Sequence, residues 1–472
     1  MFAITSIGFP LFALLLVPLW YRTAPARRWC VMLAASGVFY LSIDPPGLPL
    51  LAAATAVVWL AAKRLNPEPA GRAKPRFWLA VGLAAALGPL LALKYSGVVY
   101  APFRGLWQPL GLAYFSLQLI SYLVDVYRGQ IGPEPRYSRL LCYAACFLSI
   151  TQGPFSRYDQ LMPQLAAPTA FVPARFYSGA QRMAWGYFKK LAVADRASVV
   201  VAAVFAAPAD FDRSQLLFVM ALYVLQLYAD FSGYTDIVLG TGEMLGLQLP
   251  ENFRQPFFAV SIKDFWQRWH ISLSAWLRDY VYIPLGGNRR GRLRKYGNLL
   301  ATFLVSGAWH AGMLTYLVWG ALHGVFQIIG DATAGLRGSV VRRFGWERSR
   351  LRRAFRCLFV FFLVSVAFVF FRAPDLAAAC RFLQGILCSP GHAVFSEYWR
   401  IGLISRLDLL LLLTGVAIVL AVELLHAKGV SLRRLVAARP RPVRWMLYEG
   451  AIFTFLLMGQ FLSGGSFLYA RF

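Results

Sequence analysis

The sequence YGNLLATFLVSGAWHAGMLTYLVWGALHGVFQIIG, residues 296–330, contains no aspartate, glutamate, lysine or arginine. The flanking segments, 278–295 and 337–356, are rich in basic residues, which the positive-inside rule places on the cytoplasmic side of a membrane. A segment with both ends on one side has to enter the bilayer and return. Two full crossings of a core about 30 Å thick need about 40 residues, and only 35 are present. We therefore predict either two short helices or a hairpin that turns inside the bilayer.

The middle of this uncharged stretch is Trp309-His310. Backbone that turns at membrane depth is tolerated only where it is buried in protein or lines a wet cavity, so we expect His310 at a cavity. An ionisable side chain in a membrane segment marks a functional site by default. The alternative is a neutral histidine that hydrogen-bonds across helices. This alternative is favoured for His323, which is nearer the cytoplasmic flank.

The rest of the chain is also apolar: 58% of its 472 residues are hydrophobic and only 15% are charged. Soluble proteins carry about 25% charged residues, so this composition excludes a soluble enzyme, a disordered protein and a fibrous repeat. We predict an all-α, polytopic integral membrane protein that forms a single domain over residues 1–472. The predicted spans lie near 3–20, 29–43, 48–62, 77–93, 109–125, 139–151, 185–206, 216–239, 299–330, 355–372, 408–425 and 447–463.

The net charge is +27, from 48 basic and 21 acidic residues. Such an excess is typical of nucleic-acid binding, but in so apolar a chain it favours basic cytoplasmic loops between spans, with no nucleic-acid partner. Basic-rich and basic-poor loops alternate, which places the N-terminus outside and predicts a multi-pass protein of the cytoplasmic (inner) membrane. Six cysteines without C-x-x-C spacing indicate neither a disulfide framework nor a metal site.

A second informative stretch is SIKDFWQRWHISLSAWLRDYVYIPLGG, residues 261–287. Ser261 and Asp264 resemble a capping box, and Pro284 followed by two glycines predicts the end of the helix. Apolar and aromatic side chains recur every three or four residues, which predicts one amphipathic helix at the membrane interface. Such stripes are more often structural than catalytic. His270 lies on the apolar side, which raises its chance of a functional role.

Several common catalytic motifs are absent. The sequence has no G-x-S-x-G, no H-E-x-x-H and no G-K-[ST]. These absences remove the main support for a serine hydrolase, a zinc protease or a P-loop ATPase.

The motifs that remain resemble the membrane-bound O-acyltransferases, and most closely their bacterial alginate-acetylation branch. The resemblance covers roughly residues 109–330. It rests on the following segments: ISYLVDVYRG (120–129), GPFSRY (153–158), DFSGYTD (230–236), ENF (251–253), the 261–287 stretch, Trp309-His310 and WGALHG (319–324).

The resemblance implies that His310 is the essential catalytic histidine and that His270 is a second, supporting one. It also implies a ring of about 11 transmembrane helices, with re-entrant and interfacial helices, around a central tunnel. The acyl donor would be acetyl-CoA or an acyl carrier on the cytoplasmic side, with no bound cofactor. The acceptor would be a secreted polysaccharide, reached directly or through an extracytoplasmic acetyltransferase partner. We expect substrate contacts from Trp266, Trp269, Arg278, Tyr282, Trp309 and His323.

Elementary chemistry agrees with this role for His310. A buried, neutral imidazole can accept a proton at pH 7, and general base catalysis is worth about 10²–10⁴-fold in rate. Two alternatives stay open at this stage. One is a D-alanyltransferase for teichoic acid that is fed by a carrier protein. The other is a transporter or flippase with histidines along its path, although no second half mirrors Asp230 and Asp236 as a repeat would.

Overall fold

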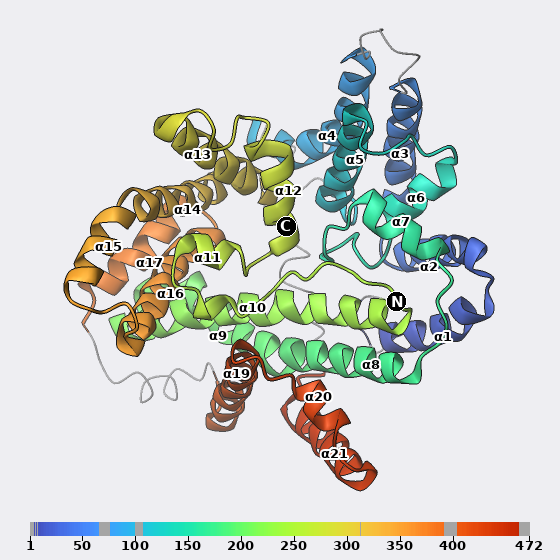
Figure 1. Ribbon diagram of the computed structural model, residues 1–472. Helices are drawn as coiled ribbons and strands as arrows, with labels where there is room; N and C mark the ends of the chain where they lie inside the picture. Colours follow the sequence, from blue (N-terminus) through green and yellow to red (C-terminus); the bar gives the residue numbers. More distant parts are fainter. Residues whose placement is uncertain are drawn as a thin grey trace. The chain divides into compact units, whose positions relative to one another are not determined.

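The computed structural model describes residues 4, 6, 8–65, 76–99, 107–311, 313–390 and 404–461, and all regular elements there are helical (Figure 1). The chain divides into two compact units. The first comprises residues Met1–Trp185 and Tyr234–Glu251, and the second comprises Gly186–Gly233 and Asn252–Phe472. Two predicted spans, 3–20 and 447–463, extend at one end into residues outside the described set.

The first unit contains seven complete helices, most of α8 and the C-terminal end of α10. The complete helices are α1 (Gly8–Arg22), α2 (Arg28–Ile43), α3 (Gly47–Arg64), α4 (Arg76–Val99), α5 (Leu112–Arg128), α6 (Tyr137–Ala145) and α7 (Tyr158–Ala166). The whole of α8 spans Pro173–Phe188. α5 is buried over almost its whole length, as expected of a helix surrounded by others.

The second unit begins at Gly186 with the last residues of α8, which a π-helical turn, Lys189–Ala194, continues. Its helices are α9 (Asp195–Ala206), most of α10 (Arg213–Met244), α11 (Ile262–Trp266), α12 (Ile271–Leu277), α13 (Gly291–His310), α14 (Leu314–Ala332), α15 (Ala334–Arg343), α16 (Arg350–Arg372), α17 (Leu376–Cys388), α19 (Arg406–Ala427), α20 (Leu432–Ala437) and α21 (Arg441–Met458).

Among the described residues, five helices are long and apolar enough to cross a membrane: α3, α4, α10, α16 and α19. They coincide with the predicted runs 48–62, 77–93, 216–239, 355–372 and 408–425, so the prediction of an all-helical protein with several apolar spans is confirmed. Other predicted runs form shorter helices. For example, the run 139–151 is helical only as far as Ala145, where α6 ends.

The uncharged stretch folds as two antiparallel helices, α13, which ends at His310, and α14, which begins at Leu314. Two glycines allow the helices to pack backbone against backbone. A Cβ atom added at Gly307 would lie 2.3 Å from the carbonyl oxygen of Tyr316, and one added at Gly320 would lie 2.4 Å from that of Phe303. At the open end, Lys295 pairs with Asp331 at 2.7 Å, so the two flanks meet. The predicted return of the chain is therefore present, in its two-helix form.

The predicted single helix over 261–287 is wrong. The capped start is present, because Ser261 Oγ accepts a hydrogen bond from the Asp264 amide. However, α11 ends at Trp266, α12 starts at Ile271, and a π-helical turn, Arg278–Tyr282, follows. The cause is a segment distant in the sequence. The Arg254 amide donates to the Arg268 carbonyl at 2.9 Å, and the Ile271 amide donates to the Asn252 carbonyl at 3.0 Å. These bonds replace those that would continue the helix.

The close packing in the hairpin gives a first testable prediction. Gly320→Ala should lower the thermal midpoint of the purified protein by a few degrees, because its methyl group meets a backbone carbonyl and overpacking costs about 1–3 kcal/mol. The matched control is Gly330→Ala on the same helix, where an added Cβ meets nothing within 4 Å. That variant should be unchanged or slightly stabilised, because alanine favours a helix over glycine by about 1 kcal/mol. Equal midpoints, measured by size-exclusion chromatography after heating, would contradict the packing argument.

Candidate active site

His310 is the last residue of α13, and only 2% of its surface is exposed. Aromatic rings surround it on several sides. Its ring centroid lies 4.8 Å from Trp309, 5.1 Å from Trp319, 5.2 Å from Phe371 and 6.5 Å from Tyr316. Trp319 and Tyr316 come from α14 and Phe371 from α16, so three helices enclose the imidazole. Enclosure by apolar rings favours the neutral form of a histidine.

His270 occupies the bend between α11 and α12. Its backbone φ angle is 45°, in the left-handed region that a residue with a side chain adopts at a cost. The Asn252 side chain supports this bend: its Oδ1 accepts from the Ser272 amide at 3.2 Å and from the Ser272 hydroxyl at 2.6 Å. The His270 ring packs edge-on to Phe231, with centroids 4.7 Å apart. Burial lowers the pKa of His270 to about 3, so the ring is neutral at physiological pH.

His323 lies on α14, three turns beyond the bend, and is fully buried. Its Nδ1 atom accepts a hydrogen bond of 3.3 Å from the indole N–H of Trp266. An acceptor at Nδ1 leaves the proton of a neutral imidazole on Nε2. The Trp266 contact therefore fixes both the orientation and the tautomer of this ring, which fits the prediction of a hydrogen-bonded histidine better than that of a free base.

Tryptophan rings connect the three histidines. Trp309 lies between His270 and His310, at centroid distances of 6.4 Å and 4.8 Å, and Trp319 lies between His310 and His323, at 5.1 Å and 5.2 Å. Six of the eight residues singled out from the sequence belong to this connected group: Trp266, Trp269, His270, Trp309, His310 and His323.

Arg278 and Tyr282 lie outside this group. Both are on the π-helical turn that follows α12. Arg278 is largely exposed and pairs with its neighbour Asp279 at 2.8 Å. Tyr282 is half-buried and faces the glycine turn at Gly287. Among the described residues, neither side chain takes part in the ring contacts that connect the histidines, and both roles stay predictions.

Several buried polar atoms near His310 have no hydrogen-bond partner among the described residues. They are Ser306 Oγ, one turn before His310 on α13, Thr315 Oγ1 and Trp319 Nε1 on α14, and His323 Nε2. Buried polar groups are nearly always paired in native proteins. These four atoms are distributed over α13 and α14 between Ser306 and His323, and polar groups of a substrate or of water would satisfy them. In the described part of the chain, no three His, Cys, Asp or Glu side chains gather as metal ligands would.

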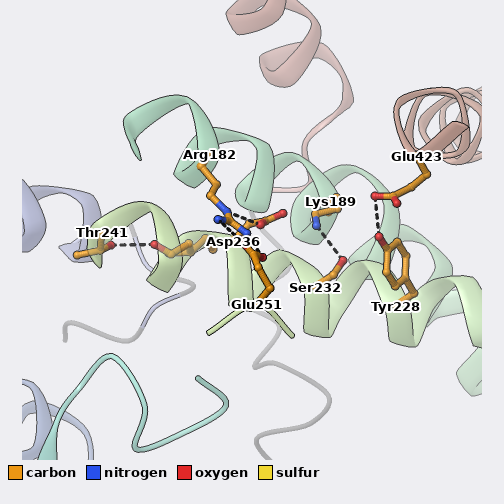
Figure 2. Close-up of polar contacts among 9 residues, drawn as sticks. Arg182, Lys189, Tyr228, Ser232, Asp236, Thr241, Glu251 and Glu423 are labelled. Carbon is orange, nitrogen blue, oxygen red and sulfur yellow. Dashed lines mark hydrogen bonds and ion pairs between the residues drawn. The ribbon is translucent and has the colours of Figure 1, made fainter. Parts of the chain in front are cut away.

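Two buried lysines in the predicted run 185–206 were not among the predicted site residues. Lys190 bonds at 2.8 Å to both Asp195 and Asp230. Lys189 donates at 2.8 Å to the hydroxyl of Ser232, as Figure 2 shows. These contacts fix α10 at Asp230 and Ser232, the residues directly before and after Phe231. The Phe231 ring packs against His270. Two adjacent lysines inside an apolar run were the available signal, because charges in such a run are paired or functional.

The first unit contains a second ionic cluster. Arg182 on α8 bonds to Asp236 and Glu251, with the Arg182 Nε atom 2.8 Å from Asp236 Oδ1 (Figure 2). Asp236 ends the DFSGYTD segment, and Glu251 begins ENF. In both of these family-like segments, the carboxylate therefore has a structural role, because it neutralises the half-buried Arg182.

Comparison with known proteins identifies the class. The sequence profile of the membrane-bound O-acyltransferase family matches residues 130–371. A probable alginate O-acetylase of Pseudomonas fluorescens is 37% identical over 395 residues, which cover 83% of this chain and 77% of the relative. A peptidoglycan O-acetyltransferase of Helicobacter pylori is 31% identical over 403 residues, covering 76% of this chain and 73% of the relative. A teichoic acid D-alanyltransferase of Bacillus subtilis is 29% identical over 230 residues, covering 46% of this chain and 58% of the relative.

The chain belongs to the membrane-bound O-acyltransferase family. The predictions of this family, of a multi-pass membrane protein and of an enzyme that carries out O-acetyl transfer are therefore confirmed. The roles of individual residues remain predictions.

The contact between Asn252 and the His270 bend can be tested. Asn252→Ala should lower stability by about 1–3 kcal/mol, because it leaves the buried Ser272 amide without its acceptor, and it should reduce acyl transfer by releasing His270. Ser272→Ala is the graded comparison, since it removes the hydroxyl contact and keeps the amide bond to Asn252. Its loss of stability should be smaller. If both variants unfold at the wild-type temperature, Asn252 does not hold the bend.

Proposed function

We propose that this enzyme transfers an acetyl group from acetyl-CoA in the cytoplasm to a hydroxyl group of a secreted polysaccharide, directly or through an extracytoplasmic partner protein. The observation that carries the proposal is the position of His310. It lies at the bend of a membrane hairpin, enclosed by aromatic rings and close to polar atoms that have no partner among the described residues. The names of the relatives, which act on alginate and on peptidoglycan, support an acetyl donor and a glycan acceptor.

In the proposed reaction, His310 acts as the general base. It takes the proton of the acceptor hydroxyl as the oxygen attacks the thioester carbonyl, because an alcohol is too weak an acid to ionise beforehand. The new C–O bond forms, the C–S bond breaks, and the proton passes from His310 to the departing thiolate. The products are the acetyl ester and free coenzyme A. The aromatic enclosure excludes bulk water, which limits hydrolysis of the thioester.

His270 would support this arrangement rather than react. Its ring is neutral and packs against Trp309, the neighbour of His310. Through Trp309 it would fix the direction in which the catalytic imidazole points. Trp266 and His323 pack against Trp319 and would fix the orientation of its ring in the same way.

We further propose the membrane arrangement that the family resemblance implies: a ring of about 11 transmembrane helices around a tunnel, in the cytoplasmic membrane. The distribution of basic residues supports this orientation, because the open end of the α13–α14 hairpin lies between Arg-rich segments. The donor would then reach the hairpin from its open end, and the acceptor would reach His310 from the other side.

The assignment of His310 predicts the effect of removing it. His310→Ala should lower acetyl transfer at least 100-fold, the lower range for a lost general base, without changing the thermal midpoint by more than a few degrees. His426→Ala, on α19, is the matched control and should leave the rate unchanged. The assay uses radiolabelled acetyl-CoA, purified enzyme in nanodiscs and a panel of soluble glycans. Undiminished transfer by His310→Ala would refute its role as base.

The donor can be tested separately. Acetyl-CoA should support transfer, whereas D-alanine carried as a thioester on an acyl carrier protein should not. The D-alanyltransferase relative covers less of the chain than the acetyltransferases do, which favours the acetyl donor. Both thioesters are offered to the same enzyme, and the label on the acceptor is counted. Label only from the carrier-bound D-alanine would replace the acetyltransferase proposal with the D-alanyl one.

A further inference from the structure

Trp319 lies on α14, directly before Gly320, one of the two glycines that bring the backbones of the hairpin together. Its side chain is 1% exposed, and its ring centroid lies 5.1 Å from that of His310, with an angle of 86° between the two ring planes. The indole Nε1 atom is buried and has no hydrogen-bond partner among the described residues. A hydrogen-bond donor without an acceptor therefore lies beside the candidate catalytic base.

The indole N–H differs from the unpartnered hydroxyl groups of the hairpin. The hydroxyls of Ser306 and Thr315 can both donate and accept a hydrogen bond. A hydroxyl on a helix can also turn back to a carbonyl of its own helix, as that of Thr302 does to Asn298 at 2.7 Å. An indole N–H can only donate, and it cannot turn unless a large ring moves with it. A buried donor of this kind is costly unless an acceptor meets it.

Neighbouring rings hold the Trp319 side chain in one orientation. Ring centroids lie 5.8 Å away for Trp266, 5.2 Å for His323, 6.1 Å for Phe368 and 5.2 Å for Phe371. The indole N–H of Trp266 has an acceptor, because it bonds to His323 at 3.3 Å, whereas that of Trp319 has none in the described part of the chain. A donor fixed before the substrate binds does not have to reorganise during the reaction, which makes it effective in catalysis.

The proposed reaction needs a donor close to His310. When the acceptor oxygen attacks the thioester carbon, one electron pair of the C=O double bond moves onto the carbonyl oxygen, which becomes an oxyanion. A hydrogen-bond donor about 3 Å from this oxygen lowers the energy of the transition state. The base and the donor serve the same tetrahedral carbon, so they can be at most about 8 Å apart. The centroid distance of 5.1 Å between the His310 and Trp319 rings fits this requirement.

We propose that the indole N–H of Trp319 binds the carbonyl oxygen of the acyl thioester and stabilises the oxyanion that forms during transfer. This inference rests on the proposed function, because it assumes that His310 is the base and that a thioester is the donor. When the oxyanion collapses, the C=O bond re-forms and the C–S bond breaks. The thiolate takes up the proton that His310 received from the hydroxyl, and Trp319 keeps its own proton throughout. Trp319 is thus a catalytic residue, and Trp266 and His323 position it.

A purely structural role of the ring has to be separated from this one. Trp319→Phe removes the N–H but also part of the ring, so it changes the packing. Replacing Trp319 by 3-benzothienylalanine, incorporated at an amber codon, exchanges the N–H for a sulfur atom and keeps the size of the ring. Trp20→Phe is the matched control. Trp20 on α1 is also 1% exposed, and its Nε1 atom likewise has no hydrogen-bond partner among the described residues.

The experiment measures kcat and the KM for acetyl-CoA with each purified protein in nanodiscs. Both replacements of Trp319 should lower kcat about 100-fold, the lower range for a lost oxyanion donor, and should change the KM less than about threefold. The pH–rate profile should keep its midpoint, because the indole N–H does not titrate. Trp20→Phe should lose thermal stability to a similar degree as Trp319→Phe and keep the wild-type kcat.

The outcomes separate this role from the reaction itself. A wild-type kcat for the benzothienylalanine protein overturns the proposal, even when Trp319→Phe is slow, because the ring and not its N–H would then matter. A shifted midpoint of the pH–rate profile also overturns it, because Trp319 would then act through His310. If the wild type uses carrier-bound D-alanine, the same comparison is made with that thioester, which passes through the same kind of oxyanion. A wild type that transfers no acyl group from either thioester refutes the proposed function and, with it, this role of Trp319.

Discussion

The close approach of α13 and α14 is the constraint on which the site depends. Gly307 and Gly320 bring the backbones together so that any Cβ atom would collide with a carbonyl of the other helix. This approach places Tyr316 and Trp319 opposite the end of α13, and with them two of the rings that enclose His310. His323 lies farther along α14, where its ring is near Phe303. A looser hairpin would leave room for water beside the thioester that the enzyme has to protect.

A second constraint acts on the other side of His310. The bend at His270 exists because Asn252 and its neighbours take the hydrogen bonds that a continuous helix would use. The ion pairs of Lys190 hold the α10 residue, Phe231, against which His270 packs. His310 is therefore fixed from two directions, through rings whose own positions are set by hydrogen bonds and charges.

Hydropathy and charge alone predicted the five apolar spans and the return of the chain at residues 296–330, because these depend on local composition. Motif resemblance located six residues that the structure brings together. The break at 267–270 was not predictable from periodicity, since its cause is pairing with residues 252–254. The partners of Lys190 likewise depend on which helices meet, and spacing along one helix does not encode this.

The hairpin also bears on how the protein is made. Neither α13 nor α14 is among the helices long and apolar enough to cross a membrane unaided, whereas α16, which follows them, is. A helix pair of this kind, uncharged over residues 296–330 but carrying buried histidines and hydroxyl groups, gains much from protein neighbours that are already in place. The residues closest to the reaction would thus enter the bilayer as a pair, late in synthesis, once α16 had emerged from the ribosome to hold them. Assembly of the catalytic centre and completion of the membrane domain would then be a single event.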